Sequence, residues 1–302
     1  MSDTILVTNN LTKKYGDKLA VDSASISIRK GAIFGLIGMN GAGKTTIMKM
    51  ISGMVKPTSG DYDYTGFDCK KEDAFSRIGA LIEAPAIYPN MSAYDNMKMK
   101  CLAYGINSKE YIEEKLKLVG LGYTGKKKAG KFSLGMKQRV GIAMALLGKP
   151  KLLILDEPIN GLDADGVRIV REVLLDITKN KECSVLISSH ILGELEKIAT
   201  HYGIIRNGKM IREMTSEELE NDCPIYIALK TKNINKSKSK LLDKYSRVEE
   251  DEEGYLRVYD DVAVEDVVVY LYDNGIIVEE IRTDKISLEE YYINLMNSKE
   301  GK

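Results

Sequence analysis

The sequence lacks long apolar runs: no stretch among its 302 residues approaches the roughly 20 consecutive apolar residues that a membrane-spanning helix needs. It also shows no signal peptide, because the opening residues Ser2, Asp3 and Thr4 are polar or acidic. We therefore expect a chain that does not itself cross a membrane. Any membrane role would then come through a partner.

Cysteine and histidine are both scarce. The four cysteines are Cys69, Cys101, Cys183 and Cys223. They include no C-x-x-C pair, so we expect reduced thiols of a cytosolic protein. The only histidines are His190 and His201. His190 ends an apolar run, whereas His201 is expected on the helix that follows, in a structural role.

The chain has no net charge overall, with 44 basic and 44 acidic side chains, but the charge is unevenly distributed. Residues 217–302 carry 12 Lys/Arg and 21 Asp/Glu, and residues 1–216 carry 32 and 23. We take this shift as a domain boundary near Thr215. A basic first domain suits an anionic ligand. The lysine run 126–128 with Lys131 is interpreted as a solvated surface, and no nucleic-acid partner is expected.

A glycine-rich loop organises the first domain: Gly38-Met39-Asn40-Gly41-Ala42-Gly43-Lys44-Thr45-Thr46 fills every fixed position of the phosphate-loop pattern G-x-x-x-x-G-K-[ST]. An apolar run at 32–37 predicts a buried strand before it, and the pattern at 47–51 predicts a helix after it. The glycines let successive backbone N–H groups point at one anion, and the helix N-terminus adds partial positive charge.

Side chains in and near this loop predict a nucleotide site. Lys44 would reach the β- and γ-phosphates, and the Thr45 hydroxyl would bind Mg²⁺. Tyr15 lies 29 residues before Lys44, where its ring could stack on adenine. Spacing alone does not distinguish that role from an ordinary tyrosine in a turn.

Two adjacent acids, Asp156 and Glu157, follow the apolar residues 152–155, which predict a buried strand. Ligands of open α/β sheets bind at the carboxyl ends of strands, where neighbouring carboxylates are costly to bury without cations. We predict that Asp156 holds Mg²⁺ through its water shell and that Glu157 polarises the attacking water. His190 follows the apolar run at 185–189 and could bond a γ-phosphate oxygen.

The remaining segments complete a two-domain α/β chain. Alternation at 4–8 and 20–28 predicts an antiparallel sheet edge, and Asn207-Gly208 predicts the turn of a closing hairpin. Residues from about 86 to 148 are predicted to form an inserted helical subdomain, which follows a buried strand ending at Glu83.

Further predictions concern the last helix of the insertion and the second domain. The last helix of the insertion is expected to begin at Ser133, whose side chain can cap it. Gly135 then exposes backbone N–H groups near the positive end of that helix. Residues 216–302 are predicted to form a small α+β domain with no cluster of catalytic side chains.

Taken together, these motifs resemble the ATP-binding cassette of ABC transporters over residues 4–213, which implies a P-loop NTPase core within a domain at 1–215. The resemblance implies nucleotide contacts by Tyr15, Gly38, Asn40, Gly41, Ala42, Gly43, Lys44, Thr45, Thr46, Ser133, Gly135 and Asp163. It implies catalytic roles for Lys44, Glu83, Glu157 and His190, and Mg²⁺ contacts by Thr45, Glu83 and Asp156.

The sequence departs from the family pattern at two places. Residues 133–137 read Ser-Leu-Gly-Met-Lys where the family signature is LSGGQ, keeping Ser133 and Gly135, which would contact the γ-phosphate of an opposite subunit. Glu83 stands where most cassettes have a glutamine, and it adds charge beside that phosphate. Together with the acidic second domain, these two departures make the chain similar to the cassettes of the bacitracin and lantibiotic immunity subfamily.

The resemblance also implies partners and a location. Two cassettes, identical or different, would close head to tail around two ATP molecules and drive a separate integral membrane permease as an exporter. The segment from 83 to about 99 would face that permease and hold the chain at the cytoplasmic face of the membrane.

Other classes fit less well. A ribosome-acting relative would carry two phosphate loops, and a DNA-repair relative would carry a long heptad insertion. A regulator that binds nucleotide without hydrolysis stays open because of Glu83, although the presence of Lys44, Asp156, Glu157 and His190 argues against it.

Overall fold

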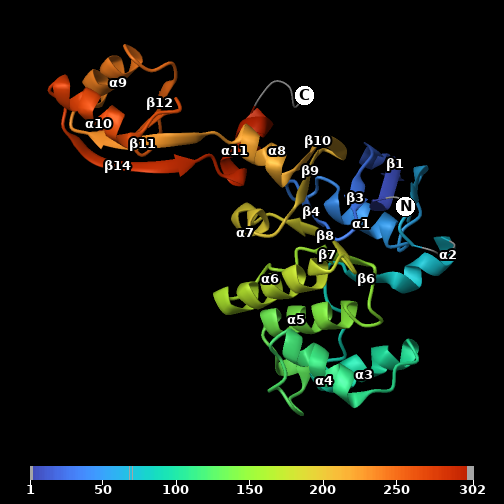
Figure 1. Ribbon diagram of the computed structural model, residues 1–302. Coiled ribbons are helices and arrows are strands. Elements are labelled where there is room, and N and C mark those ends of the chain that lie inside the picture. The colour runs from blue at the N-terminus through green and yellow to red at the C-terminus, as the bar shows by residue number, and fades with distance from the viewer. Residues whose placement is uncertain (1–2, 68, 70, 298–302) are drawn as a thin grey trace. The chain divides into compact units, whose positions relative to one another are not determined.

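The computed structural model describes residues 3–67, 69 and 71–297 and divides into two compact units, Met1–Ser216 and Glu217–Lys302 (Figure 1). Each unit has its own apolar core. The core of the first unit draws on residues between Ile5 and Ile205, and that of the second on residues between Ile227 and Ile281.

A six-stranded sheet forms the centre of the first unit, in the order β10-β9-β4-β8-β7-β6. Its strands are β4 (Ile33–Ile37), β6 (Ile78–Leu81), β7 (Leu152–Asp156), β8 (Ser184–Ser189), β9 (His201–Arg206) and β10 (Lys209–Thr215). Neighbouring strands are parallel except β10, which returns antiparallel to β9. Every residue of β4, β7 and β8 is buried, which explains the apolar residues that dominate β4 and β7 and the apolar centre of β8.

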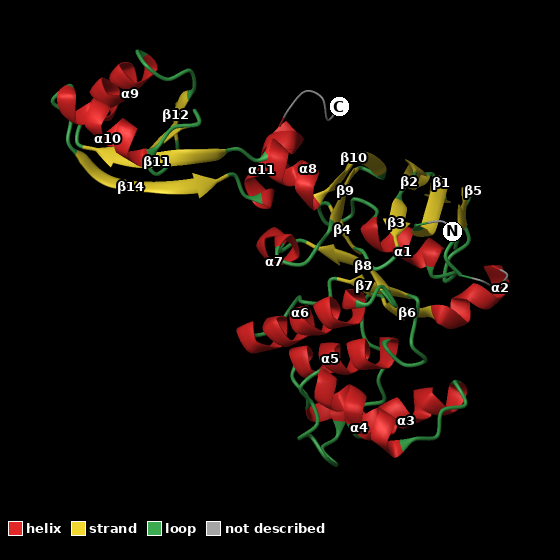
Figure 2. Cartoon of the chain, in the orientation of Figure 1, coloured by secondary structure: helices red, strands yellow, loops and turns green. Residues whose placement is uncertain are grey.

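Helices flank this sheet (Figure 2). They are α1 (Lys44–Ile51), α6 (Ala164–Lys179) and α7 (Leu192–Glu196), while the short helix α2 (Lys71–Ala74) and the 3₁₀ turn η1 (Phe75–Arg77) precede β6 in the chain. Helix α1 contacts β7 and α6 contacts β8. The carboxyl ends of β4, β7 and β8 therefore meet the N-terminus of α1 at one edge of the sheet.

An antiparallel sheet precedes this core. It contains β1 (Thr4–Tyr15), β2 (Lys18–Ala24), β3 (Ser27–Arg29) and β5 (Ser59–Asp63). Strand β1 pairs with each of the other three. The antiparallel edge predicted from alternating residues is confirmed. Tyr15, the last residue of β1, lies at the same pocket as the phosphate loop.

A helical segment interrupts the core sheet. It contains α3 (Ala93–Ala103), α4 (Lys109–Leu118), the 3₁₀ turn η2 (Ala129–Lys131) and α5 (Leu134–Ala145). The chain leaves the sheet after β6 and returns at β7, yet these two strands are paired neighbours. Helices α3 and α4 both contact α5, as Figure 2 shows. The segment is thus an excursion from an otherwise continuous sheet.

The second unit has the βαββαβ topology of ferredoxin-like domains. Its elements are β11 (Ile225–Thr231), α9 (Ile234–Leu242), β12 (Val248–Glu250), β13 (Leu256–Val258), α10 (Val264–Asp273) and β14 (Val278–Lys285). The antiparallel sheet has the order β12-β13-β11-β14. Helix α8 (Ser216–Asp222) leads into this fold and α11 (Leu288–Asn297) follows it.

One local prediction was wrong. His201 is not on a helix but is the first residue of β9, where it pairs with Phe34 of β4. The preceding helix α7 already ends at Glu196, because Thr200 N–H bonds to Ile33 O at 2.9 Å and draws the chain into the sheet. Sheet pairing therefore outweighs the helical pattern at this point.

Candidate nucleotide-binding site

The glycine-rich loop joins β4 to α1, and its glycines have distinct physical roles. Gly41 and Gly43 adopt φ values of +81° and +114°, which residues with a Cβ rarely reach. A Cβ on Gly38 would lie 2.6 Å from Ile205 O of the neighbouring strand. The loop therefore needs glycine at two positions for its curl and at one for close packing.

Lys44 opens α1 and points back into the loop. Its side chain is buried, with 5% of the residue exposed. The ammonium donates to Gly38 O at 2.6 Å and lies 3.6 Å from Glu157 Oε1. This places a cation between the loop backbone and the acid at the end of β7, where a phosphate group would meet it.

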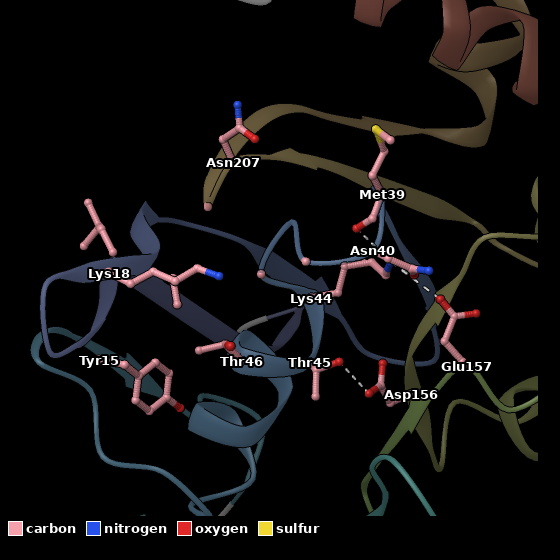
Figure 3. Close-up of a pocket in the computed structure, with 15 residues that line it drawn as sticks. Tyr15, Lys18, Met39, Asn40, Lys44, Thr45, Thr46, Asp156, Glu157 and Asn207 are labelled. Carbon is pink, nitrogen blue, oxygen red and sulfur yellow. Dashed lines mark hydrogen bonds and ion pairs between the residues drawn. The ribbon is translucent and has the colours of Figure 1, made fainter.

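Thr45 and Asp156 are joined directly. The Thr45 hydroxyl donates to Asp156 Oδ2 at 2.7 Å, as the dashed line in Figure 3 shows. The other carboxylate oxygen of Asp156 accepts from Ser188 Oγ at 2.6 Å. Two of the three residues predicted to contact Mg²⁺ are therefore in direct contact with each other.

Glu157 occupies a strained turn after β7. Its φ is +50°, a left-handed conformation that is uncommon for residues other than glycine. Its Oε2 lies 2.6 Å from His190 Nδ1 and accepts from His190 N–H at 3.2 Å. Its Oε1 is buried and accepts no hydrogen bond from the described residues. One carboxylate oxygen is thus fixed by His190, and the other faces Lys44.

An open pocket of about 620 Å³ connects these groups. Its lining includes Tyr15, Lys18, Leu19, Ala20, Met39, Asn40, Gly41, Gly43, Lys44, Thr45, Thr46, Asp156, Glu157, Asn207 and Gly208. Figure 3 shows Tyr15 and Glu157 at opposite ends of it. Tyr15 is 47% exposed, and Lys13 Nζ lies 5.0 Å from its ring centroid. An exposed ring at one end and charged groups at the other match the shape of a nucleotide.

Several predicted residues do not line this pocket. Ser133 is the N-cap of α5, as predicted, and accepts from Met136 N–H at 3.2 Å. Asp163 caps α6 by accepting from Gly166 N–H at 2.9 Å. A Cβ on Gly135 would meet Leu162 Cδ2 at 3.0 Å. These three residues lie at the beginnings of two neighbouring helices, so their nucleotide roles stay predictions.

Glu83 is also outside the pocket lining. Its side chain is 64% exposed, and Oε1 lies 2.5 Å from Lys49 Nζ on α1. Its φ is +63°, so the chain turns sharply after β6. The Mg²⁺ contact predicted for Glu83 remains a prediction, and Lys49 is a partner that the sequence analysis did not identify.

The sequence did not identify several polar residues at the site. Ser188 joins Asp156 to Glu157, and Lys18 and Asn207 line the pocket. The register that pairs Lys18 with Tyr15 could have placed Lys18 there, since it follows from the Gly16-Asp17 turn. Asn207 lies at the β9–β10 turn, whose Gly208 N–H bonds to Ala42 O at 2.9 Å.

The side chains at the phosphate end suit Mg²⁺. The Thr45 hydroxyl and the Asp156 carboxylate are hard oxygen donors of the type that Mg²⁺ prefers. Within the described part of the chain, no three His, Cys, Asp or Glu side chains are grouped to hold a metal ion by themselves. Such a site agrees with the usual arrangement in nucleotide enzymes, where phosphates and water complete the coordination of Mg²⁺.

This sheet order, with a phosphate loop between β4 and α1 and two acids after β7, defines a P-loop NTPase fold. Residues 21–160 match the sequence profile of the ABC transporter family. The chain is 40% identical over 299 residues, 97% of each chain, to the bacitracin transport ATP-binding protein BcrA of Bacillus licheniformis. It is 45% identical over 217 residues, 72% of this chain and 93% of the relative, to the lantibiotic transport ATP-binding protein SrtF of Streptococcus pyogenes. The chain therefore belongs to the ATP-binding proteins of ABC transporters.

Solved structures agree with this assignment. An ATP-binding subunit of an ABC transporter matches with a TM-score of 0.65 and 27% identity over 72% of this chain and 93% of that chain. The ADP conformation of the ATP-binding cassette MJ1267 matches with a TM-score of 0.62 and 28% identity, over 73% and 94%. The family and the fold predicted from the sequence are confirmed. Among the described helices, none has the length and apolar character to cross a membrane.

Proposed function

We propose that this protein is the ATP-hydrolysing subunit of an exporter for a peptide antibiotic and acts through a separate membrane-spanning protein. The observation that carries this proposal is the 40% identity to BcrA over 97% of both chains. That match extends through both compact units, whereas the match to SrtF covers 72% of this chain. Bacitracin-type peptides are therefore the first substrates to test.

The geometry supports hydrolysis through distinct roles for the side chains that surround the pocket. Lys44 would hold the β- and γ-phosphates against the loop N–H groups, and Tyr15 would stack on the base. Glu157, bonded to His190 at 2.6 Å, would accept a proton from the attacking water. Thr45 and Asp156 would hold Mg²⁺, which when bound neutralises charge on the phosphates.

The proposal includes assembly and location. Ser133 and Gly135 would complete the nucleotide site of a second cassette, so that two ATP molecules lie between two protomers. A membrane-spanning partner would hold the pair at the cytoplasmic face of the membrane. The observation in favour is that Ser133, at the start of α5, does not line the pocket of its own chain.

The test begins with the purified protein and Mg²⁺-ATP, where we expect turnover in the wild type and very little in Glu157→Gln. The chain is then expressed in sensitive cells with the membrane protein that co-purifies with it. We expect a higher inhibitory concentration of bacitracin with the wild type than with Glu157→Gln, and nisin serves as a lantibiotic comparison. Unchanged sensitivity to both peptides, with ATP turnover intact, would refute the proposed substrate class but not the ATPase activity.

A further inference from the structure

Ser188 lies between the two acids that follow β7. It is fully buried on β8, where its backbone is paired with that of Asp156. Its hydroxyl donates to Asp156 Oδ1 at 2.6 Å and accepts from Glu157 N–H at 2.9 Å. One hydroxyl therefore uses both its donor and an acceptor position on two consecutive acidic residues.

The contact with Asp156 fixes the plane of a carboxylate. Because Ser188 holds Oδ1, the other oxygen Oδ2 is directed to the Thr45 hydroxyl at 2.7 Å. Without Ser188 the carboxylate could rotate, and Oδ1 would be buried without its donor. The position of Asp156 toward Thr45 thus depends on Ser188, which does not itself line the pocket.

The contact with Glu157 supports a strained backbone. At φ +50° this residue is in a conformation that its side chain disfavours, and the surrounding structure must maintain it. Ser188 Oγ accepts its N–H, and His190 in the loop after β8 holds its carboxylate. The end of β8 therefore fixes both the backbone and the side chain of Glu157.

We propose that Ser188 is a positioning residue for ATP hydrolysis. Its hydroxyl orients Asp156 toward Thr45 and Glu157 toward the attacking water. This inference rests on the proposed ATPase function. It goes further by assigning the alignment of two acids to one buried hydroxyl of the adjacent strand.

A purely structural role makes a different prediction, because β8 contains a matched control. Ser184 is equally buried on the same strand, and its hydroxyl accepts from Gly31 N–H at 2.9 Å, away from the site. If Ser188 only stabilises the sheet, Ser188→Ala and Ser184→Ala should lose similar stability and keep similar turnover. If Ser188 positions the acids, only Ser188→Ala should lose turnover.

The experiment measures kcat, KM for ATP, the half-saturating Mg²⁺ concentration and the urea midpoint for the wild type, Ser188→Ala and Ser184→Ala. We expect Ser188→Ala to lower kcat by about tenfold or more, as loss of a hydrogen bond to a charged group implies. We also expect a higher Mg²⁺ requirement and a KM changed less than kcat. Ser184→Ala should keep the kcat and Mg²⁺ requirement of the wild type.

A second pair of variants distinguishes the effect of the hydroxyl from the effect of side-chain packing. This pair also tests the proposal if Ser188→Ala does not fold. Ser188→Thr keeps the hydroxyl, and Ser188→Val has the same shape without it, so we expect faster turnover in the threonine variant. Equal kcat and Mg²⁺ requirement in these two, or in Ser188→Ala and Ser184→Ala, would overturn the inference while the ATPase function stands. A wild type that binds Mg²⁺-ATP without hydrolysing it would overturn the proposed function, and this inference with it.

Discussion

Lys49 and Glu83 show how one substitution in a family pattern is accommodated by a neighbouring residue. Lys49 lies one helical turn after Thr45 on α1, and its ammonium is 2.5 Å from Glu83 Oε1. Exposed ion pairs typically contribute about 0–1 kcal/mol to stability. We therefore expect this pair to matter through the charge it neutralises near the phosphate end of the pocket, and not through folding.

The first prediction is that Lys49 is needed only while Glu83 carries a charge. Lys49→Ala should lower the rate of ATP turnover by roughly three- to tenfold in the wild type, because the carboxylate then repels the phosphates unopposed. In a Glu83→Gln background the same change should have little effect. Steady-state ATPase assays on the four proteins test this, with Arg168→Ala, an exposed side chain of α6, as a control. Equal losses in both backgrounds would show that Lys49 acts independently of Glu83.

The second prediction concerns thiol chemistry. Burial raises the pKa of the Cys183 thiol to about 12 and also raises the pKa of Cys101. Since only the thiolate reacts, about one Cys183 in ten thousand is reactive at pH 8. We expect Ellman's reagent to modify the half-buried Cys69 first in the native protein, and all four cysteines in guanidinium chloride. Rapid native modification of Cys183, or an unchanged rapid phase in Cys69→Ser, would contradict this.

Contiguous motifs could be identified from the sequence, and the roles of their residues at the nucleotide stay predictions. Lys44 and Thr45 are adjacent in the chain, and so are Asp156 and Glu157, so spacing alone identifies them. Ser188 was missed because its role depends on β8 lying beside β7, which is a property of sheet order. No local pattern distinguishes it from Ser184 four residues earlier.

Helices α5 and α6 each begin with a capping side chain. Ser133 and Asp163, both assigned to the nucleotide by resemblance, each accept a backbone N–H of their own helix. The initial residues of these helices are close together, as Gly135 and Leu162 show. Any contact that these residues make with a second protomer therefore depends on two well-formed helix beginnings.

The third prediction is that Asp163 stabilises α6 in the isolated chain. Asp163→Ala should lower the free energy of unfolding by about 1 kcal/mol, because the Gly166 N–H loses its acceptor. Asp163→Ser keeps a capping oxygen and should retain most of the stability. Urea titration followed by far-ultraviolet circular dichroism measures both. A midpoint unchanged in Asp163→Ala would mean that the cap contributes nothing measurable.

Elements with strong periodicity were predicted, and those formed by pairing were not. The parallel strands were readable as apolar runs, because both faces of their sheet are covered. Strand β12 has no apolar pattern of its own, since two of its three residues are glutamates, and it is held by its register with β13. The fold of the second unit likewise depends on the order of its strands in the sheet. A sequence pattern of strands and helices does not specify that order.

At the scale of the whole molecule, the chain consists of two units whose apolar cores share no residue. The first unit contains every residue assigned to the nucleotide, and the second is acidic.

The fourth prediction is that a chain ending at Ser216 folds and binds ATP with an affinity within about threefold of the full protein. Isothermal titration with ATP and Mg²⁺ tests this. Complete loss of binding in a demonstrably folded truncation would show that the second unit shapes the site.

The fifth prediction is that two protomers assemble around ATP. Its basis is that Ser133 and Gly135 do not line the pocket of their own chain. Glu157→Gln removes the base but keeps the size of the side chain, so ATP should accumulate between two closed protomers. We expect this variant to shift from monomer to dimer on size-exclusion chromatography when ATP and Mg²⁺ are added. If the natural partner is a different cassette, the shift should appear when the co-purifying cassette is supplied.

A second substitution in Glu157→Gln then tests the contribution of α5 to the opposite site. Gly135→Asp should abolish the dimer, because its carboxylate would face the γ-phosphate of the other protomer in a gap with little water to screen the repulsion. Gly135→Ala is the matched control, since its Cβ meets the same Leu162 Cδ2 at 3.0 Å without adding charge. We expect dimers with alanine, none with aspartate, and ATP binding by single chains of both. Dimers that persist with aspartate would refute the role of Gly135 across the interface, whereas loss with both residues would assign the effect to packing against Leu162.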